Sequence, residues 1–262
     1  MTETPAPQTL VLDGNLRSHN IRLPEAARRA SGIRILGRKI RTAIFTTDIA
    51  LIRNCDADAV FAVYPFTPQQ IISKMLVEAS SIPVLVGVGG GTTSGARSAQ
   101  LAYDAEAAGA YGVVLNAPAS YTTLEMVSRI IDIPTIATVV SPDLEIVRNK
   151  IQAGASIINV AGGTSTASIV AAIRETFPDV PIMATGGKSE ESIIATVEAG
   201  ANTIICTPPS TAELFSPMME TYRTSAVVGG KSHDIRPISE ASLAEIQGRL
   251  EGIRSLRLLT ED

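Results

Sequence analysis

Apolar residues along this chain form two alternating patterns from residue 41 onward. Short, nearly continuous apolar runs, typical of buried strands, alternate with longer stretches in which apolar residues recur every three or four positions, as in amphipathic helices. The predicted strands span residues 41–47, 59–64, 84–88, 112–116, 135–140, 156–160, 182–185 and 203–206. The predicted helices are clearest at 68–79, 94–108, 122–131, 144–153, 166–177, 190–199 and 211–224. The pattern therefore predicts strands that are each followed by a helix.

An internal repeat supports this alternation. The tripeptide Ala-Gly-Ala occurs at 108–110, 153–155 and 199–201, so that successive copies lie 45 and 46 residues apart. Each copy precedes a predicted strand, and the intervening strands start with a proline, at Pro83, Pro134 and Pro181. Glycine commonly ends a helix, and proline is tolerated as the first residue of a strand. One repeat thus contains two strand–helix units, and a looser copy earlier in the chain completes a fourfold repeat.

Strand–helix units with apolar strands, repeated in this way, predict an α/β fold: a closed parallel (βα)8 barrel, the TIM barrel, with N-terminal and C-terminal helical extensions. We place the N-terminal extension at 1–38, the barrel at 39–228 and the C-terminal helical extension at 229–262, all within one domain. The competing fold is an open doubly wound sheet. Its support is the glycine-rich stretch 87–95, but the spacing of those glycines fits a dinucleotide-binding loop poorly.

The two extensions break the repeat. Residues 2–7 are expected to be disordered, and a short helix is expected at 23–31. An amphipathic helix is predicted at 239–258, where it covers the open end of the barrel or meets a second subunit of a homo-oligomer. The sequence therefore leaves a homo-oligomer open.

Composition narrows the range of partners and compartments. The chain has 262 residues, a formal net charge of −4 and 4% aromatic residues, and it has no basic run, so nucleic acid is not an expected partner. Cys55 and Cys206 stand in apolar contexts and form no spaced cluster, which indicates free thiols in a reducing compartment. The chain shows neither a signal peptide nor an apolar run of membrane-spanning length, so no membrane association and a cytoplasmic location are expected.

Candidate binding groups gather in loops that follow the later strands. After the strand at 182–185, Gly186 and Gly187 allow a tight turn, and Lys188 precedes a helix that starts at Ser189 with two acidic residues. The loop at 161–166 carries Gly162, Gly163 and Thr164, and Ser210 follows the last strand. Bare backbone N–H groups at helix starts attract anions, so these loops predict a phosphate-binding site. Glycine turns with hydroxyl caps explain the same residues without a ligand.

The stretch 182–201 resembles the seventh strand, loop and helix of phosphate-binding (βα)8 barrels. It is most similar to the 2-keto-3-deoxy-6-phosphogluconate aldolases, with weaker similarity to N-acylglucosamine-6-phosphate epimerases and thiamine-phosphate synthases. The resemblance covers about the last third of the predicted barrel, 153–210, and it implies the barrel fold and a phosphorylated ligand. Those aldolases carry a Schiff-base lysine on the sixth strand, whereas the strand at 156–160 contains no lysine. Aldolase chemistry is therefore not expected.

Few residues at the predicted strand ends carry chemistry. Asp48 is the best candidate for a general base, and capping of the short helix at 49–54 is its alternative role. Lys188 is the candidate partner for a substrate anion or a developing negative charge, or else a solvated loop lysine. Asn116 and Asn159 are candidates for orienting a ligand, and Tyr64 for donating its phenolic hydrogen; each is otherwise a structural side chain.

A metal site and a cofactor are not predicted. Both histidines, His19 and His233, lie outside the predicted strand ends, and one carboxylate is too few for a Mg²⁺ cage. The expected partner is an anionic small molecule, a phosphorylated or carboxylated sugar-like metabolite. The expected function is lyase-type or isomerase-type proton transfer at the mouth of the barrel. The alternatives are a non-catalytic metabolite-binding barrel and a hydrolase in which Asp48 activates water.

Overall fold

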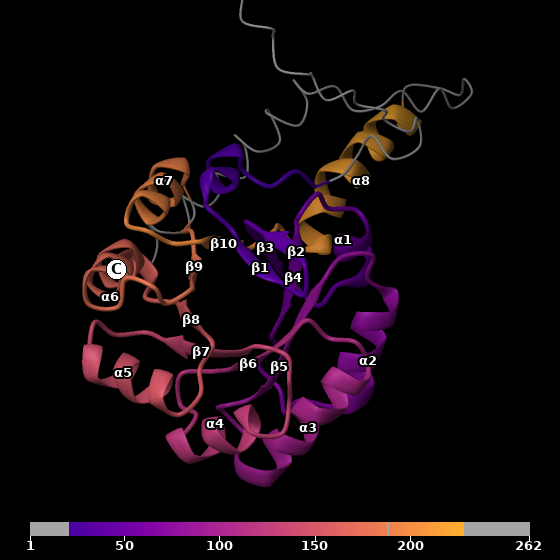
Figure 1. Cartoon of the computed structure of the whole chain (residues 1–262). Coiled ribbons are helices and arrows are strands. Elements are labelled where there is room, and N and C mark those ends of the chain that lie inside the picture. The colour runs from indigo at the N-terminus through magenta and orange to yellow at the C-terminus, as the bar shows by residue number, and fades with distance from the viewer. Residues whose placement is uncertain (1–20, 188, 228–262) are drawn as a thin grey trace, which may run out of the picture. The chain divides into compact units, whose positions relative to one another are not determined.

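The computed structural model of the chain describes residues 21–187 and 189–227. The chain divides into two compact units, one formed by Ile21–Pro208 and the other by Met1–Asn20 together with Pro209–Asp262. In the first unit eight parallel strands close into a barrel in the order β3-β4-β5-β6-β7-β8-β9-β10, with β10 pairing back to β3 (Figure 1). The strands are β3 (Thr42–Phe45), β4 (Ala59–Ala62), β5 (Val84–Gly89), β6 (Gly112–Leu115), β7 (Thr135–Val139), β8 (Ile157–Val160), β9 (Ile182–Thr185) and β10 (Thr203–Cys206). The predicted TIM barrel is confirmed.

Helices connect the successive strands and lie outside the ring of strands (Figure 1). They are α1 (Ile49–Arg53), α2 (Gln70–Ala79), α3 (Gly95–Ala107), α4 (Tyr121–Ser128), α5 (Leu144–Gln152), α6 (Thr166–Thr176) and α7 (Glu190–Glu198), with the short 3-10 helix η2 (Gly163–Ser165) before α6. Gly109, Gly154 and Gly200 follow α3, α5 and α7 with φ of 95°, 101° and 103°. These left-handed conformations favour glycine, so the repeated Ala-Gly-Ala does end helices, as predicted.

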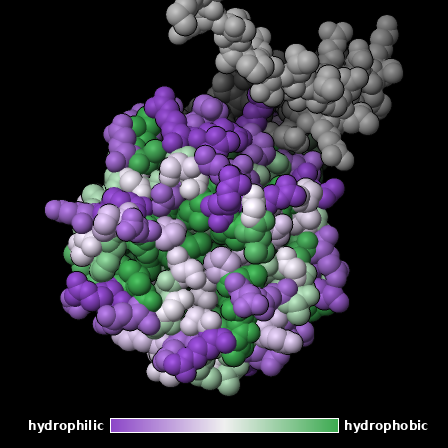
Figure 2. Space-filling view, in the orientation of Figure 1, coloured by the Kyte–Doolittle hydropathy of each residue, from purple (hydrophilic) through white to green (hydrophobic). Residues whose placement is uncertain are grey.

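Side chains of each strand alternate between two apolar layers because successive residues point to opposite faces. Ile44, Val86 and Ile158 belong to the layer that the helices cover. Leu85 and Ile157, one residue away in β5 and β8, belong to a second cluster in the barrel interior. Both layers are buried, which explains why the strands read as continuous apolar runs. On the face shown in Figure 2, apolar residues reach the surface between polar ones near the middle of the view, and polar residues dominate the rim.

A small hairpin closes the end of the barrel at which the strands begin. Strand β1 (Ile33–Ile35) pairs antiparallel with β2 (Arg38–Ile40), and their isoleucines belong to the same buried cluster as the barrel interior. The turn between them uses Leu36 and Gly37, with φ of 44° and 79°. Two residues with positive φ are the requirement of a tight type I′ hairpin. The sequence pattern did not predict this hairpin.

The segments that flank the barrel are only partly described. The short helix expected at 23–31 is the 3-10 helix η1 (Glu25–Arg29). In the second unit, α8 (Thr211–Val227) corresponds to the helix predicted at 211–224, with Pro217 inside it. The disorder predicted at 2–7 and the helix predicted at 239–258 lie outside the described residues. None of the helices in the described part of the chain is long and apolar enough to cross a membrane.

Candidate functional site at the mouth of the barrel

The carboxyl ends of the eight parallel strands meet at one end of the barrel, here called the mouth, where function resides in this fold. Tyr64 follows β4, Asn116 follows β6, and Asn159 lies within β8. The predicted glycines follow β8 and β9. The barrel therefore brings most of the predicted site residues to one end, although on different sides of the ring.

A pocket of about 200 Å³ opens at the ends of β4, β5 and β6. Its lining includes Tyr64, Phe66, Gly87, Gly89, Thr92 and Asn116. We call it the mouth pocket. The pocket brings together two predicted site residues, Tyr64 and Asn116. It also includes glycines of the stretch 87–95, for which the sequence predicted no binding role because their spacing fits a dinucleotide-binding loop poorly. The sequence signal for these glycines was their position at the carboxyl end of an apolar run: Gly87 and Gly89 lie in the second half of β5.

The hydroxyl of Tyr64 has a defined hydrogen-bonding role. Its oxygen accepts a hydrogen bond from the backbone N–H of Gln69 at 2.9 Å. A phenol can accept and donate at once, so this contact fixes the oxygen and leaves the O–H hydrogen for a second partner. Across the rim of the same pocket, the hydroxyls of Thr67 and Thr92 lie 3.1 Å apart in a hydrogen bond that links two neighbouring loops. Tyr64 can thus donate to a ligand from a loop that is itself held in place.

Asn116 is held by its backbone, which leaves its side chain available. Its N–H donates to Gly89 O at 2.9 Å, and its own carbonyl accepts from Ala119 N at 3.0 Å. Gly90 packs against the same residue: with φ of 102°, a Cβ there would lie 2.6 Å from the backbone N and O of Asn116. The Asn116 amide makes no hydrogen bond to another described residue. It can therefore offer both a donor and an acceptor to a ligand in the mouth pocket.

Asn159 has an unpaired polar group inside the barrel. The side chain is 3% exposed, and its Nδ2 donates to Thr138 Oγ1 at 3.1 Å. Its Oδ1 is buried and has no hydrogen-bond partner among the described residues. Exchanging the amide N and O would leave the other end of the amide unpaired, so the finding does not depend on that assignment. An unpaired buried polar atom costs about 1–3 kcal/mol, which makes Asn159 a place where a ligand group would be stabilised.

Two N–H groups of the predicted phosphate site are already bonded within the chain. Gly162 N donates to Thr166 Oγ1 at 3.1 Å, and Gly186 N donates to Ile205 O at 3.1 Å. Ser189 caps α7 through a capping box with Ser192, which confirms the predicted helix start. Lys188 lies outside the described residues. The phosphate site at Gly162, Gly163, Thr164, Gly186 and Gly187 stays a prediction.

The carboxylate of Glu191, in the first turn of α7, adds a negative charge next to the predicted phosphate site. The backbone N–H of Glu191 and the hydroxyl of Ser189 lower the pKa of the Glu191 carboxyl below its usual value. Glu191 is therefore ionised at neutral pH. Its negative charge satisfies the N-terminal end of α7, where a bound anion would otherwise be favoured.

Asp48 occupies the capping position that the sequence offered as its alternative role. Its Oδ1 accepts hydrogen bonds from Ala50 N at 2.8 Å and Leu51 N at 3.4 Å at the start of α1. The catalytic role of Asp48 stays a prediction. Ser210 belongs to the second unit, where its hydroxyl lies 2.9 Å from Glu213 Oε2 and accepts from Glu213 N.

The two cysteines are free thiols with low reactivity. Burial raises the pKa of Cys206 to about 11, with Arg28 opposing and Asp56 adding to the shift. Burial also raises the pKa of Cys55. Since the thiolate is the nucleophile, neither residue is suited to covalent catalysis at neutral pH.

No family model and no curated protein matches this sequence, but solved structures match its fold. A phosphonopyruvate hydrolase in complex with oxalate and Mg²⁺ aligns over 90% of this chain and 98% of its own, with a TM-score of 0.56 and 16% identity. Oxaloacetate acetylhydrolase with its product oxalate aligns over 88% of this chain and 94% of its own (TM-score 0.57, 11% identity). For 2,3-dimethylmalate lyase, of the PEP mutase/isocitrate lyase superfamily, the shares are 84% and 92% (TM-score 0.55, 13% identity).

At these identities the likeness establishes the barrel fold alone. It agrees with the barrel fold that the sequence resemblance to phosphate-binding (βα)8 barrels implied. The superfamily of these neighbours is not that of the 2-keto-3-deoxy-6-phosphogluconate aldolases, so the specific likeness to those aldolases is not supported. The neighbours include lyases and hydrolases that, by their names, act on carboxylated or phosphonate metabolites.

The Mg²⁺ of the phosphonopyruvate hydrolase raises the question whether this chain offers a similar ion a site. Within residues 21–187 and 189–227, no group of three or more His, Cys, Asp or Glu side chains could hold a metal ion. The carboxylate that the sequence places at the mouth, Asp48, caps a helix.

Proposed function

We propose that this barrel is an enzyme that binds a small carboxylated metabolite in the mouth pocket and catalyses lyase-type or isomerase-type proton transfer. The observation that carries the proposal is the meeting of Tyr64 and Asn116 in one pocket at the mouth. At about 200 Å³ this pocket is smaller than the roughly 300–1,000 Å³ typical of drug-sized ligands. Its size suits an acid of a few carbon atoms better than a sugar phosphate.

The chemistry of the pocket agrees with a carboxylate ligand. A carboxylate only accepts hydrogen bonds, and the groups available here include two donors, the Tyr64 hydroxyl and the Asn116 amide. In the proposed reaction Asp48 removes a proton from the bound acid, and these donors stabilise the negative charge that develops. The names of the structural neighbours, two of which were solved with oxalate, agree with this substrate class.

Oxalate titration with a matched pair of variants tests the binding step. Tyr64→Phe removes a hydroxyl at the mouth pocket, and Tyr103→Phe removes one from the exposed face of α3, where Tyr103 is 53% exposed. A hydrogen bond to a charged group is worth about 1.5–3 kcal/mol, so Tyr64→Phe should weaken oxalate binding by about tenfold or more. Tyr103→Phe should leave the affinity unchanged. Equal affinities in both variants and the wild type, measured by calorimetry with EDTA present, would remove Tyr64 from the site.

A second measurement separates an enzyme from a binding protein. Pyruvate is a small 2-oxo acid whose methyl hydrogens exchange with solvent once a base removes one of them. In D₂O the enzyme should speed deuterium incorporation into pyruvate above the background rate, as measured by proton NMR. A barrel that binds oxalate without promoting this exchange would support the non-catalytic alternative.

A further inference from the structure

A second and larger cavity lies at the end of the barrel opposite the mouth. Its volume is about 530 Å³, and we call it the hairpin pocket because the turn between β1 and β2 forms one wall. The other walls come from residues just before β4, β5 and β6, among them Asp58, Ile82 and Tyr111. The volume lies inside the range of roughly 300–1,000 Å³ that is typical of ligand sites.

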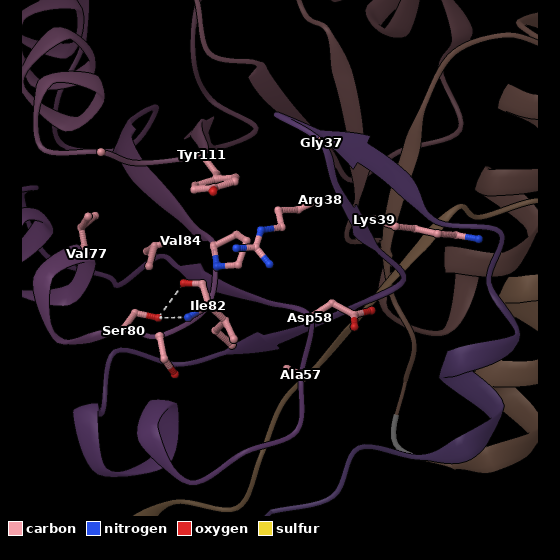
Figure 3. Close-up of a pocket in the computed structure, with 13 residues that line it drawn as sticks. Gly37, Arg38, Lys39, Ala57, Asp58, Val77, Ser80, Ile82, Val84 and Tyr111 are labelled. Atoms are coloured by element: carbon pink, nitrogen blue, oxygen red, sulfur yellow. Dashed lines mark hydrogen bonds between the residues drawn. The ribbon is translucent and has the colours of Figure 1, made fainter. Parts of the chain in front are cut away.

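Arg38 gives this pocket a positive charge. In Figure 3 its side chain extends from the hairpin into the space between Tyr111 and Ile82. The guanidinium makes no hydrogen bond and no ion pair with any described residue. Lys39, the next residue of β2, also lines the pocket, but in the same view its ammonium end points away from that space. The guanidinium of Arg38 is therefore the cationic end that extends into the pocket.

The carboxylate in the pocket lining does not neutralise Arg38. Asp58 Oδ2 accepts hydrogen bonds from the backbone N–H groups of Arg41 at 2.8 Å and Thr42 at 3.0 Å. Figure 3 shows its carboxylate pointing away from Arg38. Asp58 thus holds the start of β3 and connects it to β4. The guanidinium is left as a donor fork suited to a carboxylate or a phosphate.

One part of the remaining lining is apolar. Val77, Ile82, Pro83 and Val84 contribute apolar surface, and the ring of Tyr111 faces the same space (Figure 3). The hydroxyl of Ser80 is already used, since it donates to Ile82 O at 2.7 Å and accepts from Ile82 N at 3.2 Å. An apolar wall opposite a single guanidinium matches a ligand that has one anionic group on an apolar body.

We propose that the hairpin pocket is a second ligand site, which binds a small organic anion whose carboxylate or phosphate pairs with Arg38 and whose apolar body packs on Ile82 and Tyr111. This site is separate from the mouth pocket. Strands β4, β5 and β6 lead from one pocket to the other, so residues at opposite ends of the same strands line the two sites. The hairpin therefore has a binding role as well as the role of closing the barrel.

The test uses the full chain and two probes with the same ring, benzoate and phenyl phosphate. Wild type, Arg38→Gln and Lys39→Gln are titrated with each probe by calorimetry at low salt. We expect at least one probe to bind, Arg38→Gln to weaken it about tenfold or more, and Lys39→Gln to change it less than about twofold. The probe that binds more tightly identifies the anionic group. Both arginine and lysine are exposed, so thermal melting should show folded variants.

Competition distinguishes this proposal from the proposed function. Oxalate at a concentration that saturates the mouth pocket should leave probe binding unchanged. Displacement of the probe by oxalate, equal affinities in the two variants, or no binding of either probe at millimolar concentration would each overturn the proposal. Should oxalate fail to bind while Arg38-dependent binding of a probe persists, the mouth assignment alone would be wrong.

Discussion

The mouth of the barrel is built differently on its two sides. On the side of β4 to β6, the loops fix their own backbone and leave side-chain groups for a ligand, as Tyr64 and Asn116 show. On the side of β8 and β9, the N–H groups of Gly162 and Gly186 are bonded within the chain. Both sides are rich in glycine and hydroxyl groups. The difference shows that such a composition predicts an anion site only if the backbone donors remain free.

The glycines on the two sides are also required for different reasons. A Cβ at Gly162 would lie 2.4 Å from Ile169 Cδ1, and one at Gly186 would lie 2.6 Å from Ile204 Cγ2. These two glycines make room for the core. Gly90 instead combines a positive φ with close approach to the backbone of Asn116, so it shapes the mouth pocket. Glycine is thus needed for core packing on the side of β8 and β9, and for the shape of the mouth pocket on the side of β4 to β6.

The largest effect is expected for Asp48→Asn. Loss of a general base slows a reaction by about 10²–10⁴-fold, and asparagine keeps an oxygen that can cap α1. Asp143→Asn is the matched control on the other side of the mouth, because Asp143 caps α5 by accepting from Glu145 N at 2.9 Å. Deuterium incorporation into pyruvate should fall in Asp48→Asn only. Equal rates in both variants would leave Asp48 as a structural cap.

A pair of glycine variants tests whether glycine is required more strictly beside the mouth pocket than on the side of β8 and β9. Gly90→Ala should destabilise the fold by about 3 kcal/mol, since it combines a left-handed conformation with a backbone clash. Gly163 has φ of 59° on the other side of the mouth, and a Cβ there would meet nothing within 4 Å. Gly163→Ala should cost only about 1 kcal/mol. Urea denaturation measures both values, and a cost for Gly163→Ala that equals that of Gly90→Ala would contradict the comparison.

Much of the fold could be predicted from the sequence, because burial on both faces leaves a strong apolar signal in each strand. The eight barrel strands lie within two residues of the predicted ends. The β1–β2 hairpin could not be predicted in the same way. Its strands are three residues each, too short for a periodic signal, and its burial depends on the barrel interior that it closes.

The candidate site could be predicted only in part. Strand ends place Tyr64 and Asn116 at the mouth, but their meeting in one pocket depends on the loops between them. The phosphate prediction rested on residue types, which do not reveal that Thr166 Oγ1 already accepts the N–H of Gly162. The unpaired Oδ1 of Asn159 is likewise a property of packing. Residue types predict which groups are present, and hydrogen bonding decides which of them are free.

A smaller effect is expected on the side of the predicted phosphate site. Lys188→Ala should weaken binding of a sugar phosphate such as glucose 6-phosphate by about tenfold without abolishing it, since a charge-assisted bond is worth about 1.5–3 kcal/mol. Glu191→Gln should act in the opposite direction, because it removes a negative charge from the start of α7. Titration of both variants checks the pair. Identical affinity in wild type and Lys188→Ala would show that no anion binds there.

The smallest effect concerns Lys150, a buried lysine of α5 behind the mouth. Lys150 is 2% exposed, and its Nζ donates to Ala117 O, next to Asn116, at 3.4 Å. No ion pair joins it to a carboxylate of the described residues. Burial lowers the pKa of Lys150, because an ammonium group loses hydration inside the protein. Lys150→Met, which keeps an unbranched side chain one atom shorter and removes the charge, should therefore raise stability by about 1 kcal/mol at neutral pH.

The pH dependence of this gain has a definite sign. Since the folded pKa of Lys150 lies below the unfolded value of about 10.4, the unfolded chain binds more protons between those two values. Wild-type stability relative to Lys150→Met should therefore rise as pH increases through that window, and the advantage of methionine should shrink. Urea denaturation of both proteins at several pH values up to about 10 measures the difference. A constant difference across that range would mean that Lys150 stays hydrated in the folded protein.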